Sequence, residues 1–397
     1  MKFAPHDLDF IADPYPAYAG LRAEAPVHYD AATDHWLVSR FADVNALLRD
    51  RRMGRTYLHL ATHAEMGHPD PPDWHAPFWD LINAGILDME PPDHTRVRRL
   101  VAKAFTPKFV EGLRPRVQAI MDELVDRVNG ASEFDLMQVA EPLPVTVIAE
   151  MLGVPEADRG HLRPWSADIC KMYELDPTIE MQRDAVRAST EFSEYLRTLA
   201  RERRHGGDDL ISRLAQVVDE GDTLTEDELV GTCVLLLNAG HEATVNSTLI
   251  GWWTLFRHPD RLRELRGDRS LLPSAIEELL RFDTPLQMFE RWVLEPFELH
   301  GVEVPRGAEL GLLFGSANHD PDAFPDPEEL LLTREPNPHL TFGAGIHFCL
   351  GAPLGRQELQ ISFATLMDRF PNLELVEEPS WKPNYIIRGL QGLRVRP

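Results

Sequence analysis

The pattern of hydrophobic and polar positions divides this chain into a mixed start, a helical middle and a mixed end. From about residue 95 to 280 the apolar positions recur at helical spacing, and proline-bearing joints separate the runs. We therefore expect a mainly α fold with a small β part that both chain ends build, in a single domain over residues 1–397. The elements predicted outside the middle are helices at 14–25, 41–50 and 353–369, and short strands at 27–30, 35–40, 290–295, 297–305 and 308–315.

One long helix is expected to cross the interior. It begins with a capping-box pair, Thr225 and Glu228, and runs for about thirty residues to Pro259. The middle of this run is apolar nearly all round the helix, which is typical of a buried helix.

The middle of this helix, AGHEATVN, combines small residues with an acid. Ala239 and Gly240 are small enough to let a ligand approach the backbone, and Glu242 places a carboxylate beside them. A zinc-binding HExxH pattern is not completed, because its fifth position is Val245. The segment is therefore a candidate site for ligand binding and acid–base chemistry.

Composition narrows the possible partners. The chain has 64 acidic and 40 basic side chains and a formal charge of -24, which argues against a nucleic-acid partner and favours a soluble, monomeric protein. The start of the sequence lacks a signal-peptide pattern, and no apolar run approaches the ~20 residues that span a bilayer. Three scattered cysteines do not form a disulfide framework. We expect a cytoplasmic protein with no membrane contact.

Cys349 lies in a glycine-rich segment, HLTFGAGIHFCLG, directly before the last long helix. Pro353 marks the first turn of that helix, where backbone N–H groups and the helix dipole favour a thiolate. Gly343, Gly345 and Gly351 let the backbone approach something flat or bulky. A lone thiolate is too few ligands for structural zinc but sufficient as one axial ligand of a haem iron. Because the CxxCH pattern is missing, such a haem would be held non-covalently.

The segment SAIEELLRF, residues 274–282, predicts a helix that Ser274 opens. Glu277 stands three residues after Ser274 and suits a capping box, whereas Glu278 and Arg281 lie one turn apart on a common face. For an isolated pair of this kind, an ordinary surface ion pair is the alternative.

A basic helix is expected in PPDHTRVRRLVAKAF. His94 and Arg98 share one face, and Arg96, Arg99 and Lys103 share another. The first face could hold anionic groups such as haem propionates, or the whole helix could be a solvated basic surface. The second face could dock an acidic partner protein.

The run FGAGIHFCLG resembles the haem-binding loop of the cytochrome P450 family, with Cys349 at the position of the proximal thiolate. The resemblance covers essentially the whole chain and is to the soluble bacterial type. It implies a mostly helical, triangular body with a minor sheet region, and heme b (iron protoporphyrin IX) as cofactor. Leu330 stands where the family usually has phenylalanine. The residues that the resemblance implies are His94, Arg98, Arg291 and His347 as propionate contacts, and Glu278, Arg281 and Arg334 as a buried ExxR network.

One departure from the family concerns proton delivery. The family's AGx(D/E)T pattern places an alcohol after the acid, whereas this sequence keeps Glu242 and has Ala243 there. Thr244 follows, but one residue is a rotation of about 100° on a helix, so its hydroxyl should not substitute directly. Three interpretations remain open: the substrate supplies a polar group that orders a water, the oxidant is peroxide, or the alanine is an engineered change.

The resemblance implies a monooxygenase that inserts one oxygen atom from O2 into a small-molecule substrate. Electrons would come from NAD(P)H through a ferredoxin and its reductase, since the chain has no convincing flavin or nicotinamide site of its own. A peroxide-driven peroxygenase is an alternative, and so is a haem-thiolate ligand-binding protein without catalysis. The expected substrate is a medium-sized lipophilic product of secondary metabolism or an aromatic compound. The residues expected to line its pocket are Ile86, Leu236, Ala239, Gly240, Met288, Phe289 and Ile387, with Trp79, Ile82, Leu87 and Ile386 as further candidates.

Overall fold

The computed structural model describes residues 3–203 and 206–397 and separates the chain into two compact units. Both units are built from discontinuous segments. Unit 1 comprises Met1–Gly54, Val117–Leu143 and Ala243–Pro397, and unit 2 comprises Arg55–Arg116 and Pro144–Glu242. The single domain expected from the sequence stays a prediction.

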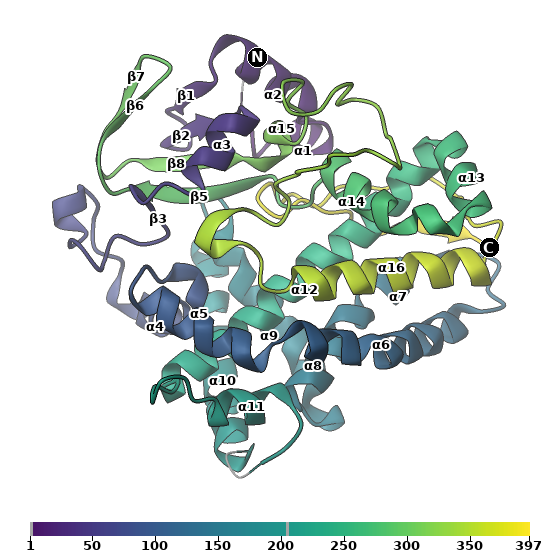
Figure 1. Cartoon of the computed structure of the whole chain (residues 1–397), viewed down its shortest axis with the longest axis horizontal. Coiled ribbons are helices and arrows are strands. Elements are labelled where there is room, and N and C mark those ends of the chain that lie inside the picture. The colour runs from purple at the N-terminus through teal and green to yellow at the C-terminus, as the bar shows by residue number, and fades with distance from the viewer. Residues whose placement is uncertain (1–2, 204–205) are drawn as a thin grey trace. The chain divides into compact units, whose positions relative to one another are not determined.

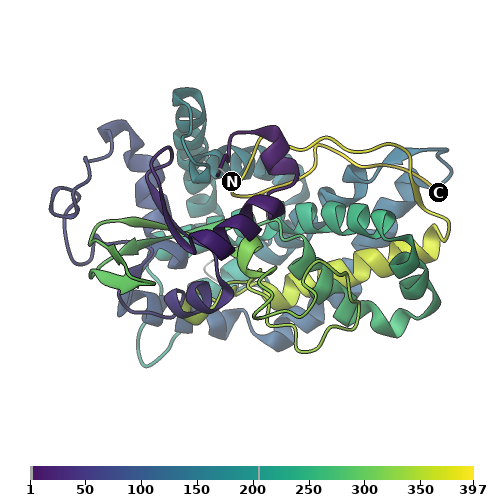
Figure 2. The same ribbon diagram turned by 90° about the horizontal axis from the view of Figure 1, so that it is seen from above.

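A five-stranded sheet in unit 1 joins the two ends of the chain, as the sequence predicted. Its order is β1-β2-β8-β5-β3; β2 and β8 are parallel, and the other neighbours are antiparallel. N-terminal and late strands lie side by side in both views (Figure 1, Figure 2). The strands are β1 (Val27–Asp30), β2 (His35–Val38), β3 (Met53–Gly54), β5 (Met288–Val293) and β8 (Glu309–Leu313).

The central position of β8 explains its sequence. Its last four residues, LGLL, are all buried, as expected of a central strand that has a neighbour on each side and side chains buried on both faces. Gly311 is required there, since an added Cβ would come 2.5 Å from the sulfur of Met288. Leu310 and Leu312 pack into a core cluster together with Val38.

The remaining helices and strands of unit 1 are α1 (Leu8–Ala12), α2 (Tyr15–Glu24), α3 (Phe41–Leu47), β4 (Phe134–Asp135), α7 (Met137–Ala140), α13 (Pro259–Gly267), η6 (Arg269–Leu271), α14 (Leu272–Phe282), β6 (Phe297–Leu299), β7 (Val302–Val304), α15 (Phe314–Ala317), η7 (Gly345–His347), α16 (Ala352–Arg369), β9 (Glu374–Leu375) and β10 (Arg394–Arg396).

Unit 2 is mainly helical. Its longest complete helix, α10, packs against α9 and α4, and its buried side chains, such as Phe192 and Leu196, recur at helical spacing. Three helices contain residues of both units: α6 (Pro107–Val128), α8 (Pro142–Leu152) and α12 (Glu226–Arg257). The elements within unit 2 are η1 (Ala64–Met66), η2 (Asp73–His75), α4 (Ala76–Asn83), η3 (Ile86–Asp88), α5 (Asp93–Ala104), η4 (Glu156–Asp158), α9 (Arg159–Cys170), η5 (Lys171–Tyr173), α10 (Ile179–Arg203) and α11 (Leu210–Gln216).

The long helix α12 starts as predicted. The backbone N–H of Glu228 donates to Thr225 Oγ1 at 3.2 Å, and the backbone N–H of Thr225 donates to Glu228 Oε2 at 2.8 Å. This reciprocal pair is the predicted capping box. Within residues 3–203 and 206–397, no helix combines the length and apolar character required to cross a membrane.

The predicted start of α14 is wrong. The helix begins at Leu272, with Pro273 in its first turn, so Ser274 lies inside it. Ser274 Oγ donates to the carbonyl of Leu271 at 3.0 Å instead of capping a free N–H group. The expected capping box between Ser274 and Glu277 is therefore absent.

Candidate functional site

The cysteine loop of unit 1, residues 339–351, holds Cys349 just ahead of α16. The backbone N–H of Cys349 donates to the carbonyl of Phe342 at 2.9 Å, which closes the loop. The thiol is partly exposed, three residues before the helix begins at Ala352. An added Cβ at Gly351 would lie 3.9 Å from the sulfur, at ordinary van der Waals distance. The loop thus places Cys349 directly before the N-terminus of α16, where the sequence predicted it.

Two glycines give the cysteine loop its shape. Gly343 and Gly345 have φ values of 67° and 71°, in the left-handed region that other residues avoid. A Cβ added at Gly345 would lie 2.3 Å from the carbonyl oxygen of Leu48, whereas one at Gly343 would meet nothing within 4 Å. The two positions share the same backbone strain and differ in steric contact.

That difference gives a matched pair of variants. We expect Gly343→Ala to lower the free energy of unfolding by about 1 kcal/mol, from backbone strain alone. Gly345→Ala should cost roughly 2–3 kcal/mol, because the loop must also move away from residue 48. Urea unfolding of both holoenzymes measures the difference, and equal costs would contradict this account of the loop.

Two further candidate residues of unit 1, both predicted propionate contacts, are His347 and Arg291. His347 ends the 3₁₀ turn η7 and is partly exposed. Arg291 lies on β5 and is 3% exposed, with its guanidinium 4.9 Å from the ring centre of Phe289. A thiol at a helix N-terminus and a buried guanidinium within one unit fit a ligand that combines a metal with carboxylates, as a haem does.

The ExxR network is a buried cluster, not a surface ion pair. Glu278 and Arg281 are both 0% exposed, and the guanidinium of Arg281 donates to both carboxylate oxygens, at 2.8 and 2.9 Å. Arg334 Nε donates to the same two oxygens at 3.1 Å each. The predicted sharing of one carboxylate by two guanidinium groups is thus confirmed, despite Leu330. Sequence spacing gave no sign of two further donors, the Leu331 backbone N–H at 3.0 Å and the Asn337 side chain at 3.2 Å.

Glu277, the neighbouring acid, has a different role from the cap that was predicted. It accepts two hydrogen bonds from Arg356 at 2.7 Å each, and its Oε2 lies 3.1 Å from His339 Nε2. Burial raises the pKa of Glu277, but the hydrogen bonds with His339 and Arg356 outweigh burial and hold this pKa at about 2. Glu277 therefore ties α14 to α16 and to the start of the cysteine loop.

This depressed pKa predicts a pH dependence. The contribution of Glu277 to stability should be complete above the ordinary carboxyl pKa of 4.5 and be lost as the pH falls towards 2. We expect Glu277→Gln to cost on the order of 2 kcal/mol at neutral pH and progressively less below about pH 4. Urea unfolding of Glu277→Gln across this pH range measures the cost, with the variant Glu111→Gln, at an exposed position, as control. A cost that stays constant down to about pH 3 would contradict it.

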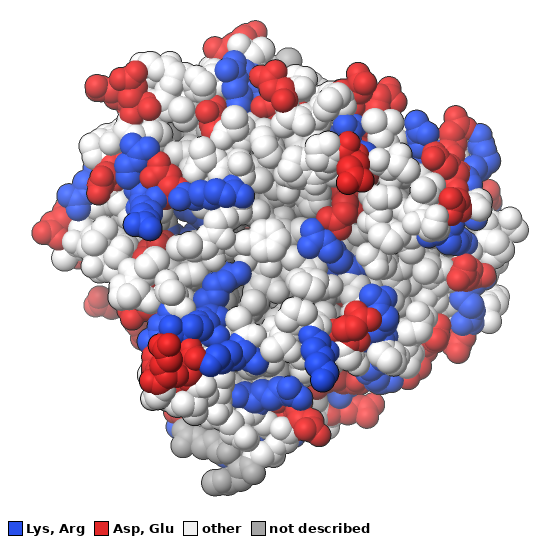
Figure 3. All heavy atoms as spheres, viewed as in Figure 1, with Lys and Arg blue, Asp and Glu red and all other residues white. Residues whose placement is uncertain are grey.

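The basic helix α5 of unit 2 has two faces, as predicted. His94 is 2% exposed and Arg98 is half-buried on the same side. The other face differs from the prediction, since Arg96, Arg99 and Lys103 form ion pairs within unit 2. Figure 3 shows Lys and Arg side chains gathered over this region with acidic side chains beside them. The partners are Asp222 and Glu228 for Arg96, Asp219 and Glu220 for Arg99, and Asp219 for Lys103.

These ion pairs remove the unopposed basic face that the docking hypothesis requires. Hydrogen bonding to Lys103 is the main cause that lowers the pKa of Asp219, so this carboxylate stays ionised. A partner that docked here would meet acids as well as bases.

In the middle of α12, one side of the helix is accessible. Leu236 and Ala243 are half-buried and Ala239 is exposed, and their spacing places them on a common side. Gly240 does not share this role, since an added Cβ would come 2.6 Å from the side chain of Ile148 on α8. The absence of a side chain at Gly240 thus permits helix packing within unit 2 and not ligand approach, which corrects the prediction.

The acid of this segment is half-buried. The Glu242 side chain is 20% exposed, with an oxygen 3.9 Å from the ring of His241. Burial and, second, the charge of Glu242 raise the pKa of Cys170 to about 12. Thr244 is 8% exposed and lies beyond Ala243 round the helix, as the rotation argument predicted.

The remaining pocket candidates divide between core and accessible positions. Met288 is 0% exposed and packs against Gly311, so it belongs to the sheet core and not to a pocket lining. Its neighbour Phe289 is half-buried and points the other way, as alternation on a strand requires. Ile387 is half-buried, whereas Ile86 of unit 2 is 5% exposed.

The sequence did not predict a role for Glu358 on α16. It is 2% exposed, and burial raises its pKa to about 8, so it is largely protonated at neutral pH. In the sequence, the only sign that Glu358 is unusual was its position as an acid within an apolar face of the helix.

Comparison with known proteins identifies similar sequences of one family. The family model described as cytochrome P450 matches residues 166–386. The chain is 41% identical to cytochrome P450 monooxygenase PikC of Streptomyces venezuelae, over 98% of this chain and 92% of that protein. It is 36% identical to the polyketide biosynthesis cytochrome P450 PksS of Bacillus subtilis, over 100% of this chain and 98% of that protein.

Solved structures share the fold. PksS superposes with a TM-score of 0.90 and 35% identity, covering 100% of this chain and 99% of that one. P450BioI, solved in complex with hexadec-9Z-enoic acid ligated acyl carrier protein, gives a TM-score of 0.91 at 33% identity, with coverage of 98% and 99%. The cytochrome P450 fold predicted from the sequence is thereby confirmed.

Proposed function

The chain belongs to the cytochrome P450 family, and from that premise we propose a set of haem contacts, a substrate class and an electron supply for this monooxygenase. The observation that carries the proposal is Cys349, held at the N-terminus of α16 by a glycine-shaped loop. A single thiolate with no second cysteine in its loop is suited to act as one ligand of a haem iron.

The proposed cofactor is heme b, with the thiolate of Cys349 as axial ligand. Its propionates would be held by the buried Arg291, by His347 in the cysteine loop, and by His94 and Arg98 on α5. When bound, a thiolate-ligated haem supplies the activation of O2 that inserts one oxygen atom into the substrate. The ExxR network contributes by fixing the segment that leads into the cysteine loop.

Proton delivery is assigned to α12. Glu242 is half-buried, so its carboxylate is reached both from solvent and from the side chains around it, as a residue that relays protons must be. Ala243 provides no hydroxyl beside it, and Thr244 is on another side of the helix. We propose that a polar group of the substrate orders a water in place of the missing alcohol.

Restoring the alcohol tests this assignment. With a substrate that assists proton delivery, Ala243→Thr should change the product formed per NAD(P)H consumed by less than about twofold, because the relay is already complete. Thr244→Ala is the matched control, and it should also have little effect. A gain approaching tenfold or more for Ala243→Thr would contradict substrate assistance.

The proposed substrate is a medium-sized lipophilic product of secondary metabolism, of the polyketide type. Support comes from the accessible apolar side of α12, formed by Leu236 and Ala239, and from the half-buried Phe289 and Ile387. The printed name of PksS, which refers to polyketide biosynthesis, points to the same class.

For electron supply we propose NAD(P)H, a ferredoxin reductase and a ferredoxin that docks on a monomer in the cytoplasm. Since α5 presents paired charges, docking should depend on complementary patterns of both signs and not on a uniformly basic patch. Charge reversal at Arg99 would therefore expose Asp219 as well as remove a cation.

The decisive experiment is a screen of macrolactones, fatty acids and their carrier-protein thioesters for the low-spin to high-spin shift of the haem spectrum. Compounds that bind are then incubated with ferredoxin, reductase and NADPH under O2. A hydroxylated product supports the proposal. Much faster turnover with hydrogen peroxide would identify a peroxygenase, and binding without product under either oxidant would identify a ligand-binding protein.

A further inference from the structure

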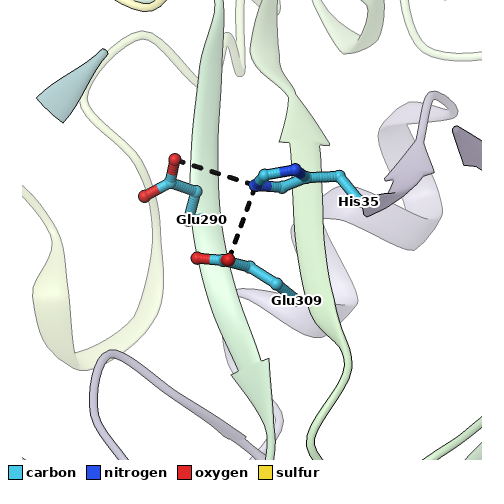
Figure 4. A group of neighbouring side chains, drawn as sticks. All are labelled: His35, Glu290 and Glu309. Carbon is cyan, nitrogen blue, oxygen red and sulfur yellow. Dashed lines mark ion pairs between the residues drawn. The ribbon is translucent and has the colours of Figure 1, made fainter. Parts of the chain in front are cut away.

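Three polar side chains project from adjacent strands of the five-stranded sheet and converge on one point (Figure 4). His35 comes from β2, Glu309 from β8 and Glu290 from β5. The register accounts for this convergence. On β2 and β8, Trp36 pairs with Leu310, which places His35 beside Glu309. On β8 and β5, Glu309 pairs with Trp292. Glu290 is two residues from Trp292, so its side chain lies on the same face of the sheet as that of Glu309.

The histidine is held in a fixed orientation. Its Nδ1 lies 2.6 Å from the carbonyl oxygen of Thr33, which can only accept, so Nδ1 carries a proton. Its Nε2 therefore faces the two acids and is the ring atom that can bind an ion there. Histidine ligands of metals usually have this outer hydrogen bond, which sets the tautomer and orients the ring.

The distances favour an ion between the three groups. Nε2 of His35 lies 3.6 Å from Glu309 Oε2 and 4.0 Å from Glu290 Oε1, and the three ligand atoms all lie within 4.8 Å of one another. These separations are too long for hydrogen bonds. A tetrahedral ion with bonds of about 2.1 Å separates its ligand atoms by roughly 3.4 Å, which is close to the observed spacing.

Burial indicates that the histidine requires a partner. His35 is 7% exposed, and among the described residues its Nε2 makes no hydrogen bond. The side chains of Glu290 and Glu309 are 30% and 23% exposed, which gives an ion a path from solvent. Each of the three residues can offer one ligand atom to a divalent cation at this point.

We propose that His35, Glu290 and Glu309 form a binding site for one Zn²⁺ ion, separate from the haem chemistry of Cys349. One imidazole nitrogen and two carboxylate oxygens are a donor set suited to zinc, with water in the fourth position. Because the ligands come from β2, β8 and β5, the ion links three neighbouring strands of the sheet. The site requires nothing of the proposed monooxygenase reaction.

Zinc titration of the holoenzyme, after dialysis against a chelator, tests the proposal. Calorimetry in competition with a chelator of known affinity should find one tight equivalent of Zn²⁺ in the wild type. His35→Ala should bind that equivalent on the order of 100-fold more weakly, and Glu309→Gln at least about tenfold. Two variants are used, so that a folding defect in one does not decide the result, and the haem spectrum checks that each is folded.

The matched control is His300→Ala. His300 Nε2 lies 2.7 Å from a single carboxylate, that of Asp43, so it offers a pair and not a three-ligand site. This variant should keep the tight equivalent, and crystals grown with zinc should give an anomalous peak among the three ligands. The proposal is overturned if the wild type binds no tight equivalent of Zn²⁺, which is the result expected if a second proton on His35 takes the place of the ion. It is also overturned if both His35→Ala and Glu309→Gln still bind the tight equivalent.

Discussion

Replacing Cys349 with alanine should abolish both monooxygenase turnover and the red-shifted Soret band of the reduced, carbon monoxide-bound enzyme. The thiol is the only cysteine ligand in the cysteine loop, and a position just before α16 favours the thiolate form. Without the sulfur, any haem that remains bound has lost its axial electron donor. The expected loss is complete within the sensitivity of either measurement.

A matched control for Cys349→Ala is Cys233→Ala. Cys233 is 0% exposed in α12, and burial raises its pKa to about 12, so it stays a neutral thiol in the core. Its loss should leave the carbonyl spectrum unchanged and cost little stability. If Cys349→Ala kept the wild-type carbonyl spectrum, the assignment of the axial ligand would be wrong.

The sequence predicted features that depend on local spacing. The capping box of Thr225 and Glu228 requires residues only three apart, and the alternation of β-prone segments at both chain ends shows in short windows. Cys349 was recognisable because glycines, a proline and a cysteine stand in one run. In each of these cases the physical cause lies within about ten residues of the feature.

Features that depend on distant partners were predicted less well. Pro273 moved the start of α14 and left Ser274 inside the helix, and Glu277 found its partners in Arg356 and His339, some 60 to 80 residues away. Gly240 was expected to face a ligand, but Ile148 occupies the space beside it. Sequence spacing shows which residues share a helix face, but it does not show what packs against that face.

The charged side chains of α5 also have partners that are distant in the sequence. A count of charges along the helix predicted a basic face at Arg99 and Lys103, yet Asp219 and Glu220, more than a hundred residues later, form ion pairs with them. A sequence window that shows bases cannot show the acids that fold against them, so a docking surface inferred from one helix overestimates the local charge.

The largest loss of stability is expected from Glu278→Gln. The two guanidinium groups that share this carboxylate are nearly inaccessible, 0% for Arg281 and 5% for the side chain of Arg334, so each would lose its counter-charge where water cannot replace it. Breaking a buried pair in this way costs about 3–5 kcal/mol. Urea unfolding at neutral pH measures this loss.

Glu277→Gln is the control for Glu278→Gln, because it changes a partly exposed network where Glu278→Gln changes a buried one. Glu277→Gln removes the same charge one position earlier in α14, but its carboxylate is 26% exposed, so solvent compensates part of the loss. Glu278→Gln should also release haem faster, because Arg281 and Arg334 both donate to the carbonyl of Glu329 and so hold the segment that leads to the cysteine loop. If Glu277→Gln and Glu278→Gln lost the same stability and released haem at the same rate, the greater burial of the Glu278 carboxylate would not be the cause of its contribution.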